Sequence, residues 1–244
     1  MTRMLCVKSQ DRLRKKLPIW KKLLFVTFAI VITIVFVYSR YLYPTGEVMQ
    51  GLYAVKGGGN NSPMVNFFLL DVGDGYIAID VGANSLQTEN ELQKLGISAD
   101  DIIAVFITHS HYDHIGALHL FDNVPLYTGN TEFQYATSSR FSPTTFEIPD
   151  MPHNKMTDGE IIKLNDITIQ CIYTPGHTSD SVSFLVDGKY LFVGDLFVTL
   201  NTAEDEELMI LSRKNVLGVQ GAEYVFTGHF GLVKDVRLFR WWFD

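Results

Sequence analysis

Short runs of apolar residues, continuous or alternating with polar ones, recur along most of the chain from residue 51 onward. Runs of this kind, bounded by Gly, Pro, Asn and Asp, predict strands separated by turns. Residues 73–75, Gly-Asp-Gly, predict a hairpin between the strands on either side. The predicted strands are Gly51–Val55, Met64–Asp71, Tyr76–Val81, Asp101–Ile107, Val124–Tyr127, Ile161–Leu164, Ile167–Tyr173, Ser181–Val186, Tyr190–Val193 and Tyr224–Phe226.

Segments with helical spacing lie between these strands. In Ser85–Leu95, Ser85 is the candidate N-cap and Gly96 the stop. Residues 138–158 contain three prolines and no clear period, so we expect a loop there. Along the chain, a run of predicted strands is followed by mixed strands and helices, and this order occurs twice. It favours two sheets packed face to face with helices outside. The other predicted helices are Ile115–Phe121, Ala203–Val216 and one from about Val233.

The N-terminal segment differs from the rest of the chain. Residues 1–22 carry eight basic residues and one acidic residue, and the seventeen residues 23–39 carry no charge. That length is at the short end of the roughly 17–25 residues that span a bilayer core, and aromatic residues flank it as interfacial anchors would. Because positive charge stays on the cytoplasmic side, we expect a single-pass anchor at 23–43 with a cytoplasmic N-terminus and an extracytoplasmic domain.

Two other interpretations of this segment stay open. A cleaved signal peptide has an apolar stretch of about 7–15 residues and a small-residue cleavage site. Here the stretch is longer, and Val37-Tyr38-Ser39 is only a weak site. A buried helix of a soluble domain is disfavoured by the basic residues that precede the stretch. The expected organisation is a basic segment at 1–22, an anchor at 23–43, a linker at 44–50 and a globular domain at 51–244.

The charge of the globular part restricts its partners. From Pro44 onward, acidic residues outnumber basic ones by 26 to 11. Because nucleic-acid binding relies on Lys and Arg at phosphates, we expect no nucleic-acid partner. The two cysteines, Cys6 and Cys171, fall on opposite sides of the predicted membrane, which argues against a disulfide. Cys171 lies in an apolar strand and is expected to be a small buried hydrophobe.

Histidine occurs seven times, and three of the seven lie within residues 109–114, directly after a predicted buried strand. Alternation puts His109 and His111 on one side of an extended segment, while Asp113 and His114 turn off beyond it. Two imidazoles can then face one cation, and a carboxylate with an imidazole can face a second. Such ligands suit zinc, and also iron or manganese. A polar loop in which histidine recurs by chance explains one histidine better than three.

Three more residues of ligand type stand directly after other predicted strands. His177 follows a Pro-Gly turn, and Asp195 and His229 each follow a glycine. Polar residues at the ends of several strands are how a site is built on one rim of a sheet scaffold. The two remaining histidines are expected elsewhere, His119 on a helix surface or in the core and His153 in a loop.

The order H-x-H-x-D-H followed by H, D and H resembles the metallo-β-lactamase superfamily, from about Gly51 to the C-terminus. Residues 79–82, Ile-Asp-Val-Gly, also match the strand-end Asp-x-Gly of that superfamily. The resemblance implies an α/β fold, a four-layer αββα sandwich, with a metal pair at the edge between its sheets. Asp80 would support a ligand without binding a metal itself. The implied ligands are His109, His111 and His177 for one metal, Asp113, His114 and His229 for the other, and Asp195 bridging both.

Such a site supports hydrolysis. Two cations held by imidazoles and two carboxylates lower the pKa of a bound water toward neutrality. The hydroxide can attack a carbonyl carbon or a phosphorus, while Asp113 orients it and carries its proton. Zinc β-lactamases of the best-known type have a cysteine where Asp195 stands, and di-iron redox relatives have a glutamate where His111 stands, so both activities are disfavoured. The pattern is most similar to the glyoxalase II, lactonase and phosphodiesterase-like members.

We therefore expect a membrane-anchored hydrolase with two metal ions, zinc first and iron or manganese as alternatives. Its substrate would be a small-molecule ester, lactone, thioester or phosphodiester. An exported domain would not meet the cytosolic glutathione thioester of glyoxalase II, and nuclease relatives need a basic surface that this domain lacks overall. The alternative is a non-catalytic metal-binding or sensory domain of the same fold. The candidate selectivity elements are residues 57–61 and 138–158.

Overall fold

The chain divides into two compact units, Met1–Arg40 and Tyr41–Asp244. In the first unit the described residues are all helical, and no helix in the described part of the chain has both the length and the apolar character to cross a bilayer. Most of the predicted basic segment, much of the predicted anchor and the helix expected beyond Val233 lie outside the described residues. The computed structural model describes residues 20–21, 24–31, 33, 43–58, 65–129, 152–198, 203–229 and 231–233.

The first sheet of the second unit has seven strands arranged in sequence order. Neighbouring strands from the first to the fourth are antiparallel, and those from the fourth to the seventh are parallel. The strands are β1 (Gly46–Met49), β2 (Leu52–Lys56), β3 (Asn66–Asp71), β4 (Tyr76–Ile79), β5 (Ile102–Phe106), β6 (Leu126–Gly129) and β7 (His153–Met156).

The second sheet has six strands in the order β13-β12-β11-β10-β9-β8. Only the pair β11 and β12 is parallel among the pairings that the described residues form in this sheet. Its strands are β8 (Ile161–Leu164), β9 (Ile167–Tyr173), β10 (Val182–Val186), β11 (Tyr190–Phe192), β12 (Tyr224–Thr227) and β13 (Gly231–Val233).

The two sheets pack face to face around an aromatic core. Phe106 on the first sheet meets Phe184 on the second with ring centroids 5.4 Å apart, and Phe68 meets Phe192 and Phe226 at 5.3 Å. Burying rings of this size is a large part of the hydrophobic stabilisation of such a domain. Strand β3 is buried over five of its six residues because it packs on both faces.

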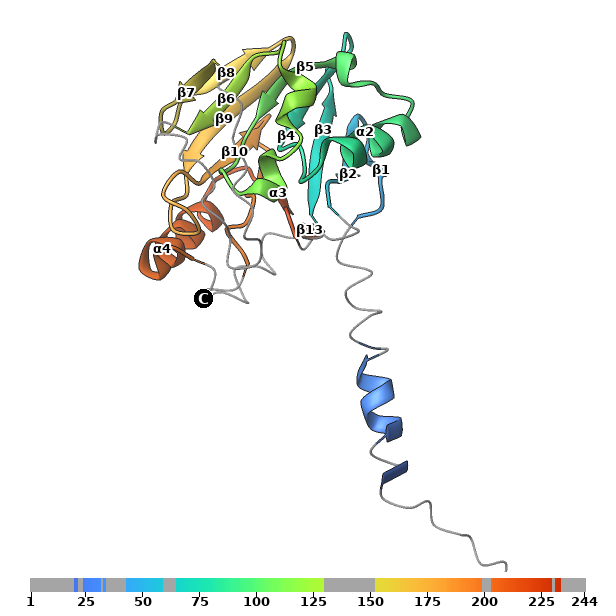
Figure 1. Ribbon diagram of the computed structural model, residues 1–244. Coiled ribbons are helices and arrows are strands. Elements are labelled where there is room, and N and C mark those ends of the chain that lie inside the picture. The colour runs from blue at the N-terminus through green and yellow to red at the C-terminus, as the bar shows by residue number, and fades with distance from the viewer. Residues whose placement is uncertain are drawn as a thin grey trace, which may run out of the picture. The chain divides into compact units, whose positions relative to one another are not determined.

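Helices cover the outer face of each sheet (Figure 1). One apolar cluster joins the first sheet to α2 and η2, and another joins the second sheet to α4. This is the expected αββα sandwich. The helices are α2 (Ser85–Lys94), η1 (Ala99–Asp101), α3 (Tyr112–Ile115), η2 (Leu118–Phe121) and α4 (Glu206–Leu217).

Three edge strands fall where the sequence predicts none: β1 and β7 in the first sheet and β13 in the second. Strand β1 lies inside the predicted linker 44–50 and pairs with β2. Strand β7 lies inside the predicted loop 138–158 and pairs with β6, so His153 is a strand residue rather than a loop residue. Three of its four side chains are polar, which hides the apolar pattern by which strands are recognised.

Helix boundaries also differ from the prediction. The N-cap of α2 is Asn84, whose side chain accepts a hydrogen bond from the N–H of Gln87, and Ser85 is the first helical residue. The single helix predicted at Ile115–Phe121 is instead two short ones, α3 and η2, which meet near Gly116. A Cβ on Gly116 would lie 2.2 Å from the Ala83 carbonyl oxygen, so this turn requires glycine.

Candidate metal centre

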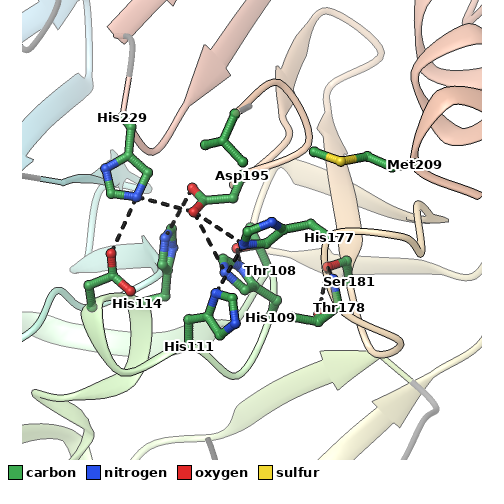
Figure 2. A network of polar contacts seen from close by, with 12 residues as sticks. Thr108, His109, His111, His114, His177, Thr178, Ser181, Asp195, Met209 and His229 are labelled. Carbon is green, nitrogen blue, oxygen red and sulfur yellow. Dashed lines mark hydrogen bonds and ion pairs between the residues drawn. The ribbon is translucent and has the colours of Figure 1, made fainter. Parts of the chain in front are cut away.

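Seven side chains of ligand type meet at one rim of the sandwich, where strands of both sheets end (Figure 2). His109 and His111 follow β5, Asp113 and His114 lie in α3, His177 lies between β9 and β10, Asp195 follows β11, and His229 follows β12. The structure thus brings together every residue that the sequence nominates as a ligand. That they bind metal stays a prediction.

The seven side chains form two groups. Within each, the nitrogen or oxygen atoms that could bind a cation all lie within 4.8 Å of one another. The first group is His109, His111, His177 and Asp195, and the second group is Asp113, His114 and His229.

The Asp195 carboxylate, a member of the first group, lies between the three histidines of that group and the second group. Its Oδ2 is 3.4 Å from Nε2 of His177 and 3.9 Å from Nε2 of His109, both in the first group. On the other side, Oδ2 is 3.1 Å from Nε2 of His229, and Oδ1 is 3.2 Å from Nε2 of His114. A carboxylate with two oxygens can serve both groups at once.

Hydrogen bonds behind the site orient two of the imidazoles. Nδ1 of His114 lies 2.8 Å from Oδ2 of Asp80, which leaves Nε2 facing Asp195. Nδ1 of His109 lies 3.1 Å from the Thr108 hydroxyl, which in turn donates to Asp80. A partner on one ring nitrogen fixes the tautomer and points the other nitrogen at a metal.

Among the described residues, the buried Nε2 of His109 and the buried Nδ1 of His177 have no hydrogen-bond partner, and Nε2 of His114 has only its ion-pair contact with Oδ1 of Asp195 at 3.2 Å. Unpartnered buried polar atoms are costly and call for an explanation. In addition, Nδ1 of His111 and Nε2 of His177 face each other at 2.9 Å. Imidazole and carboxylate donors that converge in this way fit a cation.

Burial dominates the electrostatics of the first group. It lowers the pKa of His109 well below its usual value, and the neighbouring His114 and His111 lower it further. Burial and the adjacent His177 lower the pKa of His111 to about 4. Both imidazoles are therefore neutral at physiological pH, which is the form that binds a metal.

Ion pairing dominates the second group. Burial opposes the charged form of His114, but the Asp195 and Asp80 carboxylates outweigh it and raise the pKa of His114 well above its usual value. By the same balance, Asp195 and Asp113 raise the pKa of His229 to about 10. Conversely, His229 and His114 hold the pKa of Asp195 well below its usual range despite burial.

Asp113 is the predicted proton carrier. Burial opposes ionisation of Asp113, but a hydrogen bond from His229 and the charge of His114 outweigh it and lower its pKa. Its Oδ2 lies 3.3 Å from Nε2 of His229. Asp113 is therefore ionised and can accept a proton.

Sequence reasoning missed residues that shape the site without contributing a ligand atom. A Cβ on Gly228 would lie 2.8 Å from Oδ1 of Asp195 and 2.8 Å from Cε1 of His114. A Cβ on Gly194, whose φ is +50°, would lie 2.5 Å from Oγ1 of Thr108. The available signal was that a glycine directly precedes each of the three late ligands.

The other residues considered earlier lie outside both groups, within the part of the chain that the structure describes. His119 is exposed in η2 and His153 is partly buried in β7. Cys171 is fully buried in the core between the sheets, and burial raises the pKa of its thiol to about 12. It is the small buried hydrophobe that was expected.

Comparison with known proteins gives a family and a fold. The family model described as the metallo-beta-lactamase superfamily matches residues 62–233. Among solved structures, a metallo-beta-lactamase family protein from Thermus thermophilus has a TM-score of 0.64 and 20% identity, covering 79% of this chain and 77% of that one. A likeness at that identity concerns the fold alone.

Two curated relatives have named activities. An atrochrysone carboxyl ACP thioesterase from Aspergillus fumigatus is 26% identical over 74% of this chain, which spans 56% of that protein. An N-acyl homoserine lactonase from Bacillus thuringiensis is 24% identical over 78% of this chain and 92% of the lactonase. The chain thus spans about half the length of the first relative and nearly all of the second.

Proposed function

The chain belongs to the metallo-β-lactamase superfamily, and on that premise we propose that it is a dinuclear metal-dependent hydrolase. The observation that carries the proposal is the convergence of seven ligand-type side chains, six of them around Asp195, with buried imidazole nitrogens on His109 and His177 that have no hydrogen-bond partner among the described residues. Five imidazoles and two carboxylates suit zinc first, and iron or manganese second.

Each of the two groups would bind one metal ion. The first group would hold one ion, the second group the other, and Asp195 would contact both. Bound there, two cations would supply the positive charge that activates water and polarises the attacked group. Asp80 and Thr108 keep His114 and His109 in the orientation that leaves their Nε2 atoms facing Asp195.

Asp113 would move the proton. Its carboxylate is ionised and almost wholly buried beside His229, so it can take a proton from the attacking water. It would hold that proton on the carboxylate and pass it to the leaving group. In this scheme no serine or cysteine nucleophile is required.

The proposed substrates are small molecules with an ester, lactone or thioester carbonyl, or a phosphodiester. The thioesterase and the lactonase among the relatives support the carbonyl substrates. The test is a panel of chromogenic esters, lactones, thioesters and phosphodiesters, assayed with the full chain before and after treatment with a chelator. We expect turnover of at least one carbonyl substrate, lost with the chelator and restored by zinc.

The second candidate is a non-catalytic metal-binding or sensory domain. The complete ligand set is compatible with it, because binding alone needs the same side chains. If the chain carries its full complement of metal and turns over none of the substrates, this candidate is favoured over the hydrolase. Turnover that a chelator leaves unchanged would exclude a metal-dependent reaction.

We also propose that residues 23–43 anchor the chain in a membrane with the N-terminus in the cytoplasm. The support is the uncharged run behind a strongly basic segment. Cys6 offers a test, because Cys171 is fully buried and does not compete for a thiol reagent. In intact cells, a membrane-impermeant maleimide should spare Cys6 of the full-length chain and label a Lys163→Cys variant on β8; labelled Cys6 would contradict this orientation.

A further inference from the structure

Asp180 is a buried carboxylate beside the first group that the proposed reaction does not use. It lies in the loop between β9 and β10, three positions after His177, and is 8% exposed. The Thr178 hydroxyl donates a hydrogen bond to its Oδ1 at 2.6 Å. The hydroxyl and the backbone N–H of Ser110 donate to the same carboxylate.

These donors belong to the two loops that carry the three histidines of the first group. Ser110 stands between His109 and His111, after a strand of the first sheet, and Thr178 follows His177, between two strands of the second sheet. One carboxylate therefore joins loops from opposite sheets. The sheets also meet nearby through a backbone hydrogen bond from the Val182 N–H to the Thr108 carbonyl, 2.8 Å long.

The loop that carries Asp180 is itself held closed. The Thr178 N–H donates to the Ser181 hydroxyl at 3.1 Å, and the two hydroxyls lie 2.7 Å apart (Figure 2). The donors that surround Asp180 are neutral, and burial raises the pKa of its carboxyl. Burying a carboxylate among neutral donors has a free-energy cost, and a residue that carries that cost needs a compensating role.

We propose that Asp180 is a positioning residue that sets the spacing of His109 and His111 from His177. The inference rests on the proposed metal centre and concerns the first group only. A carboxylate accepts hydrogen bonds at both oxygens, whereas an asparagine would turn an amide toward a hydroxyl or N–H donor. Asp180→Asn therefore lets the two loops separate, and the first ion loses affinity by about tenfold, the lower end of what outer partners contribute.

The test measures zinc affinity in the full chain. Chelator-treated protein is titrated with zinc against a chromogenic chelator, which gives two dissociation constants, and a His111→Ala variant identifies the one that belongs to the first group. We expect Asp180→Asn to raise that constant about tenfold and to leave the second unchanged. The matched control is Asp187→Asn, because Asp187 likewise accepts from a threonine N–H and hydroxyl, but in the exposed turn between β10 and β11.

A double-mutant cycle separates positioning from general stability. If Asp180 acts through Ser110, then Ser110→Ala raises the zinc dissociation constant of the first group in the wild-type background. The same substitution causes no further rise in the Asp180→Asn background. If both zinc dissociation constants stay unchanged in Asp180→Asn, the inference is wrong. It is also wrong if both constants rise together and the Tm falls, because a general loss of folded structure would weaken both sites in that way. If the Asp180→Asn variant does not fold, Ser110→Ala alone tests the inference: the zinc dissociation constant of the first group should rise while the second stays unchanged.

The wild-type titration keeps this inference distinct from the proposed function. A wild-type chain that binds no zinc overturns the metal centre and the inference with it. A chain that binds two ions but hydrolyses nothing overturns the hydrolase alone, since the effect of Asp180→Asn on zinc affinity is measured without turnover.

Discussion

Nδ1 of His114 lies 2.8 Å from Oδ2 of Asp80, although the two residues are 34 positions apart in the chain. The same carboxylate accepts hydrogen bonds from the backbone N–H of Thr108 at 2.8 Å and from its hydroxyl at 2.9 Å. Asp80 thus links a ligand of the second group to the segment that leads into the first group. It contacts His114 directly and reaches His109 only through the Thr108 hydroxyl.

We expect Asp80→Asn to weaken metal binding by about 10–100-fold, because partners of this kind orient a ligating imidazole. Asparagine is the suitable substitution since it tolerates the positive φ of Asp80, +60°. Zinc titration of the chelator-treated chain measures the effect, with Asp71→Asn at an exposed strand end as the control. Affinity equal to wild type would show that the Asp80 contact is not needed to orient His114.

Asp113→Asn tests the proton-carrying role. The amide keeps the shape of the side chain but cannot accept a proton, so we expect kcat on any accepted substrate to fall by about 100-fold or more. The variant should stay folded, because the rest of the sandwich is untouched. Steady-state kinetics on the substrate panel, with circular dichroism as the folding check, measure this. Activity within a few-fold of wild type would remove Asp113 from the mechanism.

The metal-free chain should lose stability as the pH rises above neutrality. The pKa of His229 is raised from 6.5 to about 10 by Asp195 and Asp113, against the effect of burial. A histidine whose pKa is higher in the folded chain than in the unfolded chain contributes to the free energy of unfolding. For His229 this contribution is complete below pH 6.5 and is lost as the pH rises through about 10. His114 acts in the same direction.

Thermal unfolding of chelator-treated protein across that pH range measures this loss. The matched variant is His229→Gln, in which the decline should be smaller because the imidazolium is gone. A Tm that is constant from neutrality to about pH 10 in the wild type would contradict the ion pairing described for the second group. Zinc should flatten the curve as well, since a bound ion displaces the same protons.

Gly228→Ala should disturb the centre from its rim. The added Cβ would lie 2.8 Å from both Oδ1 of Asp195 and Cε1 of His114, so at least one of them must move. We expect a loss of about 1–3 kcal/mol in stability, typical of an overpacked site, together with weaker zinc binding. Gly46→Ala is the control, since a Cβ there meets nothing within 4 Å. Equal zinc affinity in the two variants would contradict the described packing.

The sequence predicts most of the sandwich because its central strands are apolar and lie between clear turns. Strands β1, β7 and β13 were not predicted for a physical reason: all three are edge strands, and β7 is mostly polar. Edge strands are identified by the hydrogen bonds they make to a neighbour, and the sequence does not show that neighbour. The break between α3 and η2 depends likewise on the close approach of Gly116 to Ala83.

All seven ligand-type residues could be nominated from the sequence because each follows a predicted strand or lies in one dense motif. Asp180 had no sequence signal, and Gly228 had only its position directly before a ligand-type residue. Asp180 matters because it reaches Ser110, which is 70 positions earlier, and Gly228 matters because it leaves room for Asp195. Both relationships exist only between loops that the fold brings together.

The most direct measurement is the metal content of the purified full chain, set beside that of an Asp195→Ala variant. Because the Asp195 carboxylate lies between the two groups, its loss should weaken both sites rather than one. We expect about two ions per wild-type chain, zinc foremost, and much less than one per chain in the variant. A wild-type chain that is fully folded and active yet carries no metal would contradict the proposed centre.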